Sequence, residues 1–242
     1  MSTLIRDYER FAKEANEICK GRVYTDHLRR YAYGVDASCY SYLPKVVVKA
    51  EDEREVRRLI RLCQQCGTPF TFRAAGSSLS GQCSSEDVLI VCNDGFKKME
   101  VIDDGKALKC ECGVIGSDAN DLLKPYNRKI GPDPATLATA LVGGILNNNS
   151  SGMCCGTAQN SYKTIRSIRV VLLDGSILDT SDQKSIDQFL KEKPQMVEDI
   201  LQLRKDILAD EELTHLIHHK YKIKNTTGYG LNSLVDFEDI ID

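Results

Sequence analysis

The sequence has no apolar run long enough to cross a membrane, and its first twenty residues carry charges throughout. A membrane-spanning helix needs about 20 predominantly apolar residues, and a signal peptide needs an uncharged apolar core. We therefore expect neither a transmembrane segment nor a signal peptide, and we expect a cytoplasmic location. Peripheral membrane association would require parts of a longer protein outside these 242 residues.

The sequence also lacks a strong excess of charge, because 32 Lys and Arg against 35 Asp and Glu leave a net charge of −3. Nucleic-acid-binding domains usually carry a marked positive charge, so we expect no nucleic-acid partner. Basic and acidic residues alternate in one cluster at a spacing that predicts the solvated face of a helix. The cluster consists of Arg54, Arg57, Arg58 and Arg61 with Glu51, Glu53 and Glu55.

Neither an internal repeat nor a low-complexity linker divides the chain. Its 42% hydrophobic and 28% charged residues are typical of a globular protein. Helical and strand patterns are mixed without regular βαβ repetition, which predicts an α+β fold. The predicted helices are residues 1–20, 51–66, 117–124, 194–207 and 211–218, and the predicted strands are 46–48, 69–73, 88–92, 107–112, 165–173 and 176–178, with a turn at 174–175.

Ten cysteines raise the question of disulfides or a metal centre. A zinc or iron–sulfur site needs about four converging ligands, usually two close pairs on turns. Here Cys63 and Cys66 fall in the last turn of a predicted helix, and Cys110 and Cys112 alternate along a predicted strand. The pattern favours reduced thiols that serve packing, and no metal site. The alternative, a cysteine-based metal protein, would contain stoichiometric zinc or iron.

A loop of glycine, serine and alanine, AAGSSLSGQ, follows the predicted strand 69–73. Such a loop can point several backbone N–H groups at one anion, and its small side chains allow close approach. A pyrophosphate suits a loop of this kind. The loop is not a dinucleotide fingerprint or a P-loop, because G-x-G-x-x-G and Gly-Lys-Ser/Thr are both absent. Many Gly/Ser loops only turn the chain, so this loop alone is not specific.

A second unusual segment, GPDPATLATALVGGILNNNSSG, covers residues 131–152. Two prolines restrain its start, and small residues lead to Gly-Gly and then to three asparagines and two serines. Buried amides and hydroxyls need hydrogen-bond partners, which favours a polar ligand. The alternatives are an irregular surface loop, or asparagines that cap local turns.

Together the two loops resemble the FAD-binding fold shared by vanillyl-alcohol oxidase, D-lactate dehydrogenase and their relatives. The resemblance is greatest to large bacterial FAD-linked oxidases of the D-2-hydroxyacid dehydrogenase type that also carry iron–sulfur motifs. It extends from about residue 24 to about residue 234. The matching segments are YAYGVDAS (31–38), FRAAGSSLSGQ (72–82), IGPDPA (130–135), GGILNNNSSGM (143–153), NSY (160–162) and VLLDG (171–175).

The resemblance implies a two-subdomain FAD-binding fold with mixed and antiparallel sheets and flanking helices. Residues 1–45 would form an N-terminal helix and an irregular lead-in, and residues 46–242 the FAD-binding domain. Within this domain we expect a small subdomain at about 46–105. A larger subdomain would follow at about 106–242, truncated at its C-terminal end.

The resemblance also implies which residues bind the cofactor. The first loop would wrap the FAD pyrophosphate, the second would lie along the ribityl chain and the flavin, and a residue of a later strand would face the adenine. The residues implied are Arg73, Ala75, Gly76, Ser77, Ser78, Leu79, Gly81, Gln82, Pro132, Asp133, Pro134, Ala135, Thr136, Thr139, Gly143, Gly144, Asn149, Ser151, Gly152 and Ile168.

The activity implied is that of an oxidoreductase. Flavin N5 would accept a hydride from D-lactate or another D-2-hydroxyacid, and an electron acceptor would reoxidise the flavin. Some relatives attach the flavin through a histidine of the first loop. No histidine lies there in this sequence, which implies non-covalent FAD; the four histidines are His27, His215, His218 and His219.

Relatives continue past a segment like 227–234 into a substrate-binding cap domain, and in the most similar group into iron–sulfur cysteines. We therefore expect this chain to be a truncated part of such a protein. The catalytic base would lie beyond Asp242, and an iron–sulfur cluster would belong only to the missing C-terminal part.

Two further alternatives remain open from the sequence. A non-enzymatic module could use the same loop to bind a nucleotide for regulation or assembly, and yellow protein with bound flavin would favour the oxidoreductase instead. A peptidoglycan-precursor reductase uses the same FAD fold. The GPDPA and NNSSGM motifs argue against the reductase.

Overall fold

The computed structural model describes residues 6–225 and 229–241 of the 242-residue chain. The chain forms two compact units, each assembled from separate stretches of sequence. Unit 1 contains the described residues up to Ile130, together with Pro134–Asn147 and Leu173–Ser176. Unit 2 contains Gly131–Asp133, Asn148–Leu172 and the described residues from Ile177 onward. The subdomain boundary expected near residue 105 remains a prediction.

A four-stranded mixed sheet forms the centre of unit 1, in the order β1-β2-β4-β3. The strands β2, β3 and β4 are parallel, and β1 is antiparallel to β2. Every residue of β4 is buried, which explains why its sequence VLIV is apolar without alternation. The strands are β1 (Val23–Tyr24), β2 (Val46–Lys49), β3 (Phe70–Arg73) and β4 (Val88–Val91).

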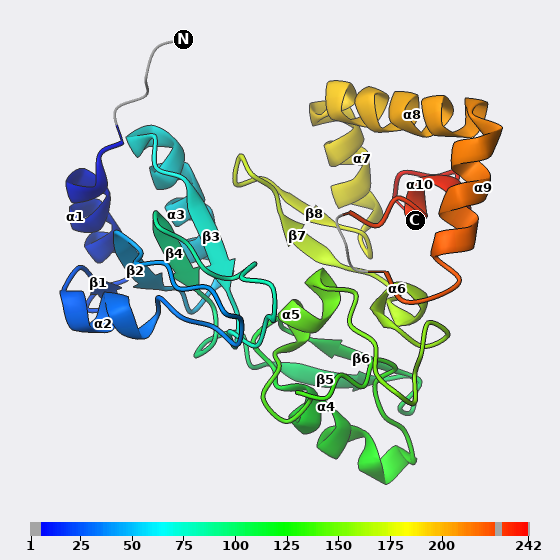
Figure 1. The fold of residues 1–242 in the computed structure, drawn as a ribbon, viewed down its shortest axis with the longest axis horizontal. Helices are drawn as coiled ribbons and strands as arrows, with labels where there is room; N and C mark the ends of the chain where they lie inside the picture. The colour runs from blue at the N-terminus through cyan, green and yellow to red at the C-terminus, as the bar shows by residue number, and fades with distance from the viewer. Residues whose placement is uncertain (1–5, 226–228, 242) are drawn as a thin grey trace. The chain divides into compact units, whose positions relative to one another are not determined.

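The helices α1 (Tyr8–Ile18) and α3 (Glu53–Cys66) pack against each other beside this sheet (Figure 1). The side chain of Asp52 caps the start of α3, and Gly67 ends the helix with a φ of +64°. The buried face of α3 follows the apolar spacing that predicted the helix. The first residues of the helix predicted at 1–20 lie outside the described part of the chain.

Two elements of the stretch expected to be irregular are ordered: β1, and α2 (His27–Ala32), which Asp26 caps. The rest of unit 1 contains an antiparallel hairpin and a small cluster of buried apolar residues, Val114, Ala119 and Val142. The elements here are β5 (Met99–Ile102), β6 (Ala107–Cys110), α4 (Gly116–Leu123), the 3-10 helix η1 (Lys124–Tyr126) and α5 (Val142–Asn147).

Unit 2 contains a second antiparallel hairpin, β7–β8, and a succession of helices (Figure 1). Helix α7 packs on β8, while α8 contacts both α9 and α10. The strand predicted at 165–173 is shorter, because Ile165 ends α6. The elements are α6 (Ser161–Thr164), β7 (Arg169–Val171), β8 (Ile177–Asp179), α7 (Gln183–Glu192), α8 (Pro194–Ala209), α9 (Glu211–Lys220) and α10 (Ser233–Asp236).

The prediction of a solvated charged face on α3 is wrong for part of that face. Nε of Arg57 donates to the Gly175 carbonyl oxygen at 2.7 Å, within unit 1. Glu55 is buried and accepts two hydrogen bonds from Arg22, at 2.6 and 3.0 Å. These charges have specific partners, so helical spacing alone did not predict their environment. The fold class itself, α+β with mixed and antiparallel sheets, is confirmed.

Candidate functional site

The carboxyl ends of the three parallel strands meet at one edge of the unit 1 sheet. Lys49 and Arg73, the last residues of β2 and β3, are both in register with Val91, the last residue of β4. The loop 74–82 follows β3 directly at this edge. In open sheets with parallel strands, ligands bind beyond the carboxyl ends of the strands. The first predicted loop therefore lies where the sheet offers a binding edge.

The backbone of this loop has hydrogen-bond donors to offer. The N–H groups of Ala75, Gly76, Ser77 and Leu79 find no acceptor among the described residues. Gly76 and Gly81 have φ values of +76° and +73°, which glycine adopts most easily. The Ser78 hydroxyl donates to the Gln82 side-chain oxygen, and the Leu79 side chain is 78% exposed. Successive free N–H groups of this kind form a concave anion site.

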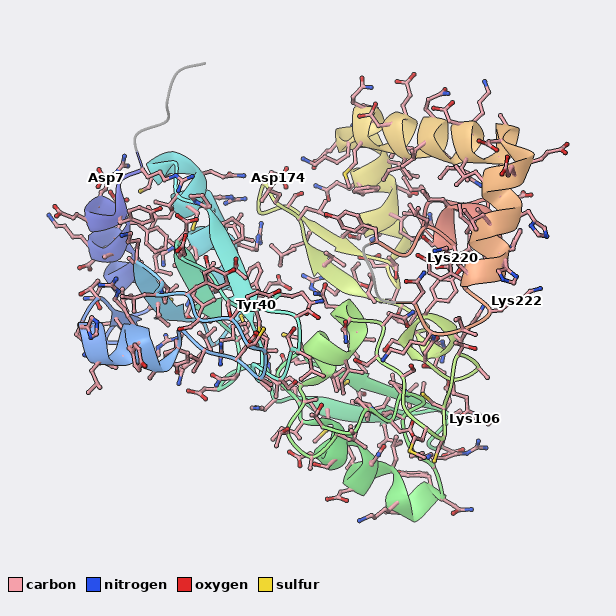
Figure 2. The ribbon with its side chains drawn as sticks, viewed as in Figure 1. Asp7, Tyr40, Lys106, Asp174, Lys220 and Lys222 are labelled. Carbon is pink, nitrogen blue, oxygen red and sulfur yellow. The ribbon has the colours of Figure 1, made fainter. Side chains whose placement is uncertain are left out.

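Residues 34–42 hold the first loop in place through hydrogen bonds and close packing. The Ala37 N–H donates to the Gly76 carbonyl oxygen at 3.1 Å, and the Cys83 thiol donates to an Asp36 oxygen at 3.3 Å. A Cβ on Gly81 would lie 2.9 Å from the ring of Tyr40, which is labelled in Figure 2. Sequence reasoning matched residues 31–38 to the family but assigned them no role. The family resemblance of residues 31–38 was the sequence feature that could have indicated these contacts with the first loop.

The Arg73 side chain folds back toward the loop, and its guanidinium lies against Gly76. A Cβ on Gly76 would collide with the Arg73 guanidinium. The guanidinium also donates to the Tyr33 carbonyl oxygen at 3.4 Å and lies 5.9 Å from the centre of the Tyr33 ring. Gly76 therefore has two requirements, a positive φ and space for this side chain.

Residues 134–147 of the second loop also belong to unit 1. Residues 134–140 form consecutive turns, in which the Pro134 and Thr136 carbonyl oxygens accept N–H groups at 2.7 to 2.9 Å. The side chains of Ala135, Thr136 and Thr139 remain exposed on these turns. The Thr139 hydroxyl donates to the Thr136 carbonyl oxygen at 3.2 Å. The Thr136 hydroxyl has no hydrogen bond among the described residues, so it is available for a ligand.

Two adjacent glycines bring the two loops together. The Gly143 N–H donates to the Cys112 carbonyl oxygen at 2.9 Å, and a Cβ on Gly143 would lie 2.6 Å from the Cys112 Cβ. A Cβ on Gly144 would lie 3.3 Å from the Cβ of Ala74, the first residue of the first loop. The start of α5 thus packs on the start of the first loop. Ala74 and Cys112 were missed, because close packing of this kind leaves no pattern in the sequence.

The other predicted residues lie in unit 2, where Asp133 is fixed by backbone donors. Its carboxylate accepts the N–H groups of Cys154 at 3.1 Å and Cys155 at 3.0 Å. The thiol and the backbone N–H of Cys155 lower the pKa of Asp133 to about 2. Gly152 lies so close that a Cβ there would collide with the Asp133 backbone. Asp133 and Gly152 therefore form one packed turn.

The remaining residues of the prediction are dispersed in unit 2. Pro132 and Ser151 are buried. Asn149 has a φ of +42° and accepts the Tyr162 N–H at 2.9 Å. Ile168 is 39% exposed just before β7, and its N–H donates to the Thr180 hydroxyl at 2.9 Å.

The cysteines are all unpaired thiols. Within residues 6–225 and 229–241, no three His, Cys, Asp or Glu side chains converge as metal ligands would. Burial raises the pKa of the Cys63 and Cys92 thiols to about 12, so both stay protonated at neutral pH. None of the helices in this described part is long and apolar enough to cross a membrane.

A family model described as "FAD binding domain" matches residues 44–181, which is more than half of the chain. The chain therefore belongs to this family of FAD-binding domains, and the resemblance inferred from the two loops is confirmed. The matched region contains both predicted loops and the whole parallel part of the unit 1 sheet.

The relatives include dehydrogenases and glycolate oxidase subunits. D-2-hydroxyglutarate dehydrogenase of Escherichia coli is 28% identical over 164 residues, 66% of this chain and 16% of that protein. D-lactate dehydrogenase of Archaeoglobus fulgidus is 28% identical over 137 residues, 55% of this chain and 30% of that protein. The chain thus spans about a sixth to a third of the length of these relatives.

The solved structures share the fold. The crystal structure of p-cresol methylhydroxylase with substrate bound matches with a TM-score of 0.60 and 16% identity, covering 71% of this chain and 35% of that one. At this identity the likeness concerns the fold alone. It agrees with the mixed and antiparallel sheets described above.

Proposed function

We propose that the chain binds FAD without a covalent bond and forms the cofactor-binding part of an oxidoreductase acting on a D-2-hydroxyacid. The observation that carries this proposal is the row of free N–H groups in loop 74–82, at the carboxyl edge of the parallel strands and packed against Gly144. A pyrophosphate fits this cradle, because several N–H donors without acceptors lie close together on a loop of small residues. When bound, the flavin would accept a hydride at N5 from the carbon that bears the substrate hydroxyl.

Each loop has its own part in this proposal. Residues 74–82 would hold the pyrophosphate through backbone N–H groups and the Ser77 and Ser78 hydroxyls. The exposed threonines Thr136 and Thr139 would contact the ribityl chain, and Gly143 and Gly144 would hold this segment close to the first loop. The cofactor contacts expected of Asn149, Ser151, Gly152 and Ile168, which all lie in unit 2, remain predictions. The relatives' names favour a D-2-hydroxyacid substrate.

The substrate's proton needs a base, and the two loops do not offer one. No histidine lies in them. Asp133 is committed to two backbone N–H groups, and with a pKa of about 2 it is a poor proton acceptor at neutral pH. We therefore propose that the base belongs to a part of the whole protein outside these residues. The electron acceptor, an iron–sulfur cluster in that part and the cytoplasmic location remain predictions.

Titration of the purified chain with FAD, followed by quenching of flavin fluorescence, tests the proposal. We expect binding by the wild-type chain and its loss in Gly76→Val, because valine displaces the Arg73 guanidinium and strains the positive φ that shapes the loop. Gly21→Val is the matched control, since Gly21 has a φ of +74° and a Cβ added there would meet nothing within 4 Å. Circular dichroism would show that both variants fold. A folded Gly76→Val chain that binds FAD as the wild type does would remove this loop from the site.

A further inference from the structure

A polar hollow of about 130 Å³ lies in unit 2, whereas loop 74–82 belongs to unit 1. Its walls come from α6, the end of α9, residues 221–225 and α10. All the residues that line it belong to unit 2, so the hollow is complete within one compact unit. It is large enough for a hydrated phosphate or a small organic acid.

Three lysines line this hollow: Lys163, Lys222 and Lys224. No carboxylate in the described part of the chain forms an ion pair with any of them. Lys163 lies 4.8 Å from the centre of the Tyr162 ring, which holds its ammonium group near the wall. The Lys222 and Lys224 side chains are exposed at the opening. The lining therefore carries positive charge that the fold itself does not neutralise.

The acidic residue of the lining, Asp236, already has its own partners. It accepts the Tyr162 hydroxyl at 2.8 Å and the Asn232 amide at 3.3 Å, and His218 Nδ1 lies 4.0 Å away. Burial and the hydrogen bond to Asp236 raise the pKa of Tyr162, so this phenol remains protonated and keeps donating. The Asp236 side chain is 29% exposed, but its carboxylate is already engaged by Tyr162 and Asn232, with His218 beside it.

Two amides add further donors. The Asn149 side-chain oxygen accepts the Tyr162 N–H at 2.9 Å, and the Asn160 side-chain oxygen accepts the Lys163 N–H at 3.1 Å. Because both oxygens face backbone donors, both NH2 groups are left to donate. Neither has an acceptor in the described part of the chain, and Asn160 is only 8% exposed. The Asn160 side chain is buried and hydrogen-bonded, so its amide group is already oriented in the absence of a ligand.

We propose that this hollow is a second binding site, specific for an oxyanion, either a phosphate group or a carboxylate. Lys222 and Lys224 supply the charge, Lys163 adds a third ammonium group, and Asn149 and Asn160 donate amide hydrogen bonds. Charge-assisted hydrogen bonds to several donors fix such a group more strongly than neutral ones do. The site needs no residue of the first loop, so it does not depend on FAD binding by unit 1.

The test is isothermal titration of the full chain with inorganic pyrophosphate, ADP and D-malate, at low ionic strength. Pyrophosphate and ADP represent a nucleotide source of the oxyanion, and D-malate represents a free organic acid. We expect at least one of the three to bind, and the Lys222→Gln/Lys224→Gln variant to weaken that binding about tenfold or more. The control is Lys220→Gln, a lysine of α9 outside the lining that is labelled with Lys222 in Figure 2.

Each outcome decides the proposal. Binding that falls in the double variant and not in the control supports it, and the ligand that binds identifies the source. No binding by any probe, or an equal loss in Lys220→Gln, overturns it. Loop 74–82 would itself take pyrophosphate or ADP, so the decisive quantity is the binding that the Lys222→Gln/Lys224→Gln variant loses. Gly76→Val should leave that binding unchanged, whatever happens to FAD, and its loss in Gly76→Val would show that the hollow is not a separate site.

Discussion

Asp133 stands between two prolines in a segment predicted to contact the flavin, yet its carboxylate faces the backbone of residues 154 and 155. The structure gives this residue a role in a turn, as an acceptor for the N–H groups of Cys154 and Cys155. A carboxylate that accepts two N–H groups acts as a cap, and replacing it exposes both donors.

The lowered pKa of Asp133 predicts a pH dependence. The pKa falls from an ordinary 3.8 to about 2, so the folded chain binds this proton less readily than the unfolded chain does. Its contribution to stability is complete above about pH 4 and is lost as the pH falls through about 2. We expect a carbon-13 titration of the Asp133 carboxyl to show a midpoint near pH 2.

Asp133→Asn provides the comparison, because an amide does not titrate in this range. Subtracting its unfolding free energy from that of the wild type between pH 5 and pH 2 should isolate the decline due to Asp133. A carboxyl midpoint near pH 4 would contradict the capping role.

The helix α3 shows how one element connects several others in unit 1. At the start of the helix, the Glu55 carboxylate accepts hydrogen bonds from the Arg22 guanidinium and from the Glu51 N–H, the latter at 2.8 Å. Despite its burial, Glu55 has a lowered pKa because of these donors, with Arg22 foremost among them. Farther along the same helix, Arg57 and Gln64 each donate to a carbonyl oxygen of the turn 173–176, at 2.7 Å. Figure 2 shows Asp174 at the tip of that turn.

Glu55→Gln should therefore destabilise unit 1. The substitution removes the nearer negative partner of the partly buried Arg22 and leaves it Glu51 at 3.6 Å. Breaking a buried pair costs about 3–5 kcal/mol, and we expect a loss toward the lower end because Glu51 remains. Urea denaturation at pH 7 would measure the change. Glu14→Gln is the control, because the Arg10–Glu14 pair is exposed at both ends and its loss should cost no more than about 0.5 kcal/mol. Equal effects of the two substitutions would show that burial of Glu55 adds nothing.

The sequence predicted long patterned elements and missed short ones. α3 was predictable because Val56, Leu59, Ile60 and Cys63 follow helical spacing up to Gly67. By contrast, β1 has two residues and exists through its pairing with β2. α2 buries none of its residues, so it presents no apolar stripe to detect.

The candidate site was predictable to the same extent. Glycine and serine marked loop 74–82, because an anion cradle requires small residues. The contacts of Ala74, Cys112 and Tyr40 depend on chain segments far apart in sequence, which a single sequence does not reveal.

For the molecule as a whole, we expect no oxidation of D-lactate by this 242-residue chain, even with FAD supplied. Hydride transfer requires a base placed at the substrate hydroxyl, and neither loop offers one. Reduction of a dye acceptor with D-lactate or D-2-hydroxyglutarate would measure the activity, with heat-inactivated chain as the blank. Robust dye reduction by the isolated chain would place the catalytic groups among these residues.

The segmented build of unit 1 also sets an order of events during synthesis. Arg57 precedes the carbonyl group of Gly175 by 118 residues, and Gln64 precedes that of Leu173 by 109. At about 5–20 residues per second, α3 emerges from the ribosome roughly 5–25 s before this turn does. During that interval Arg57 and Gln64 of α3 lack their hydrogen-bond acceptors in the turn 173–176. A chain halted at Asn147 would lack these acceptors permanently. Unit 1 can be completed only after most of the chain has been made.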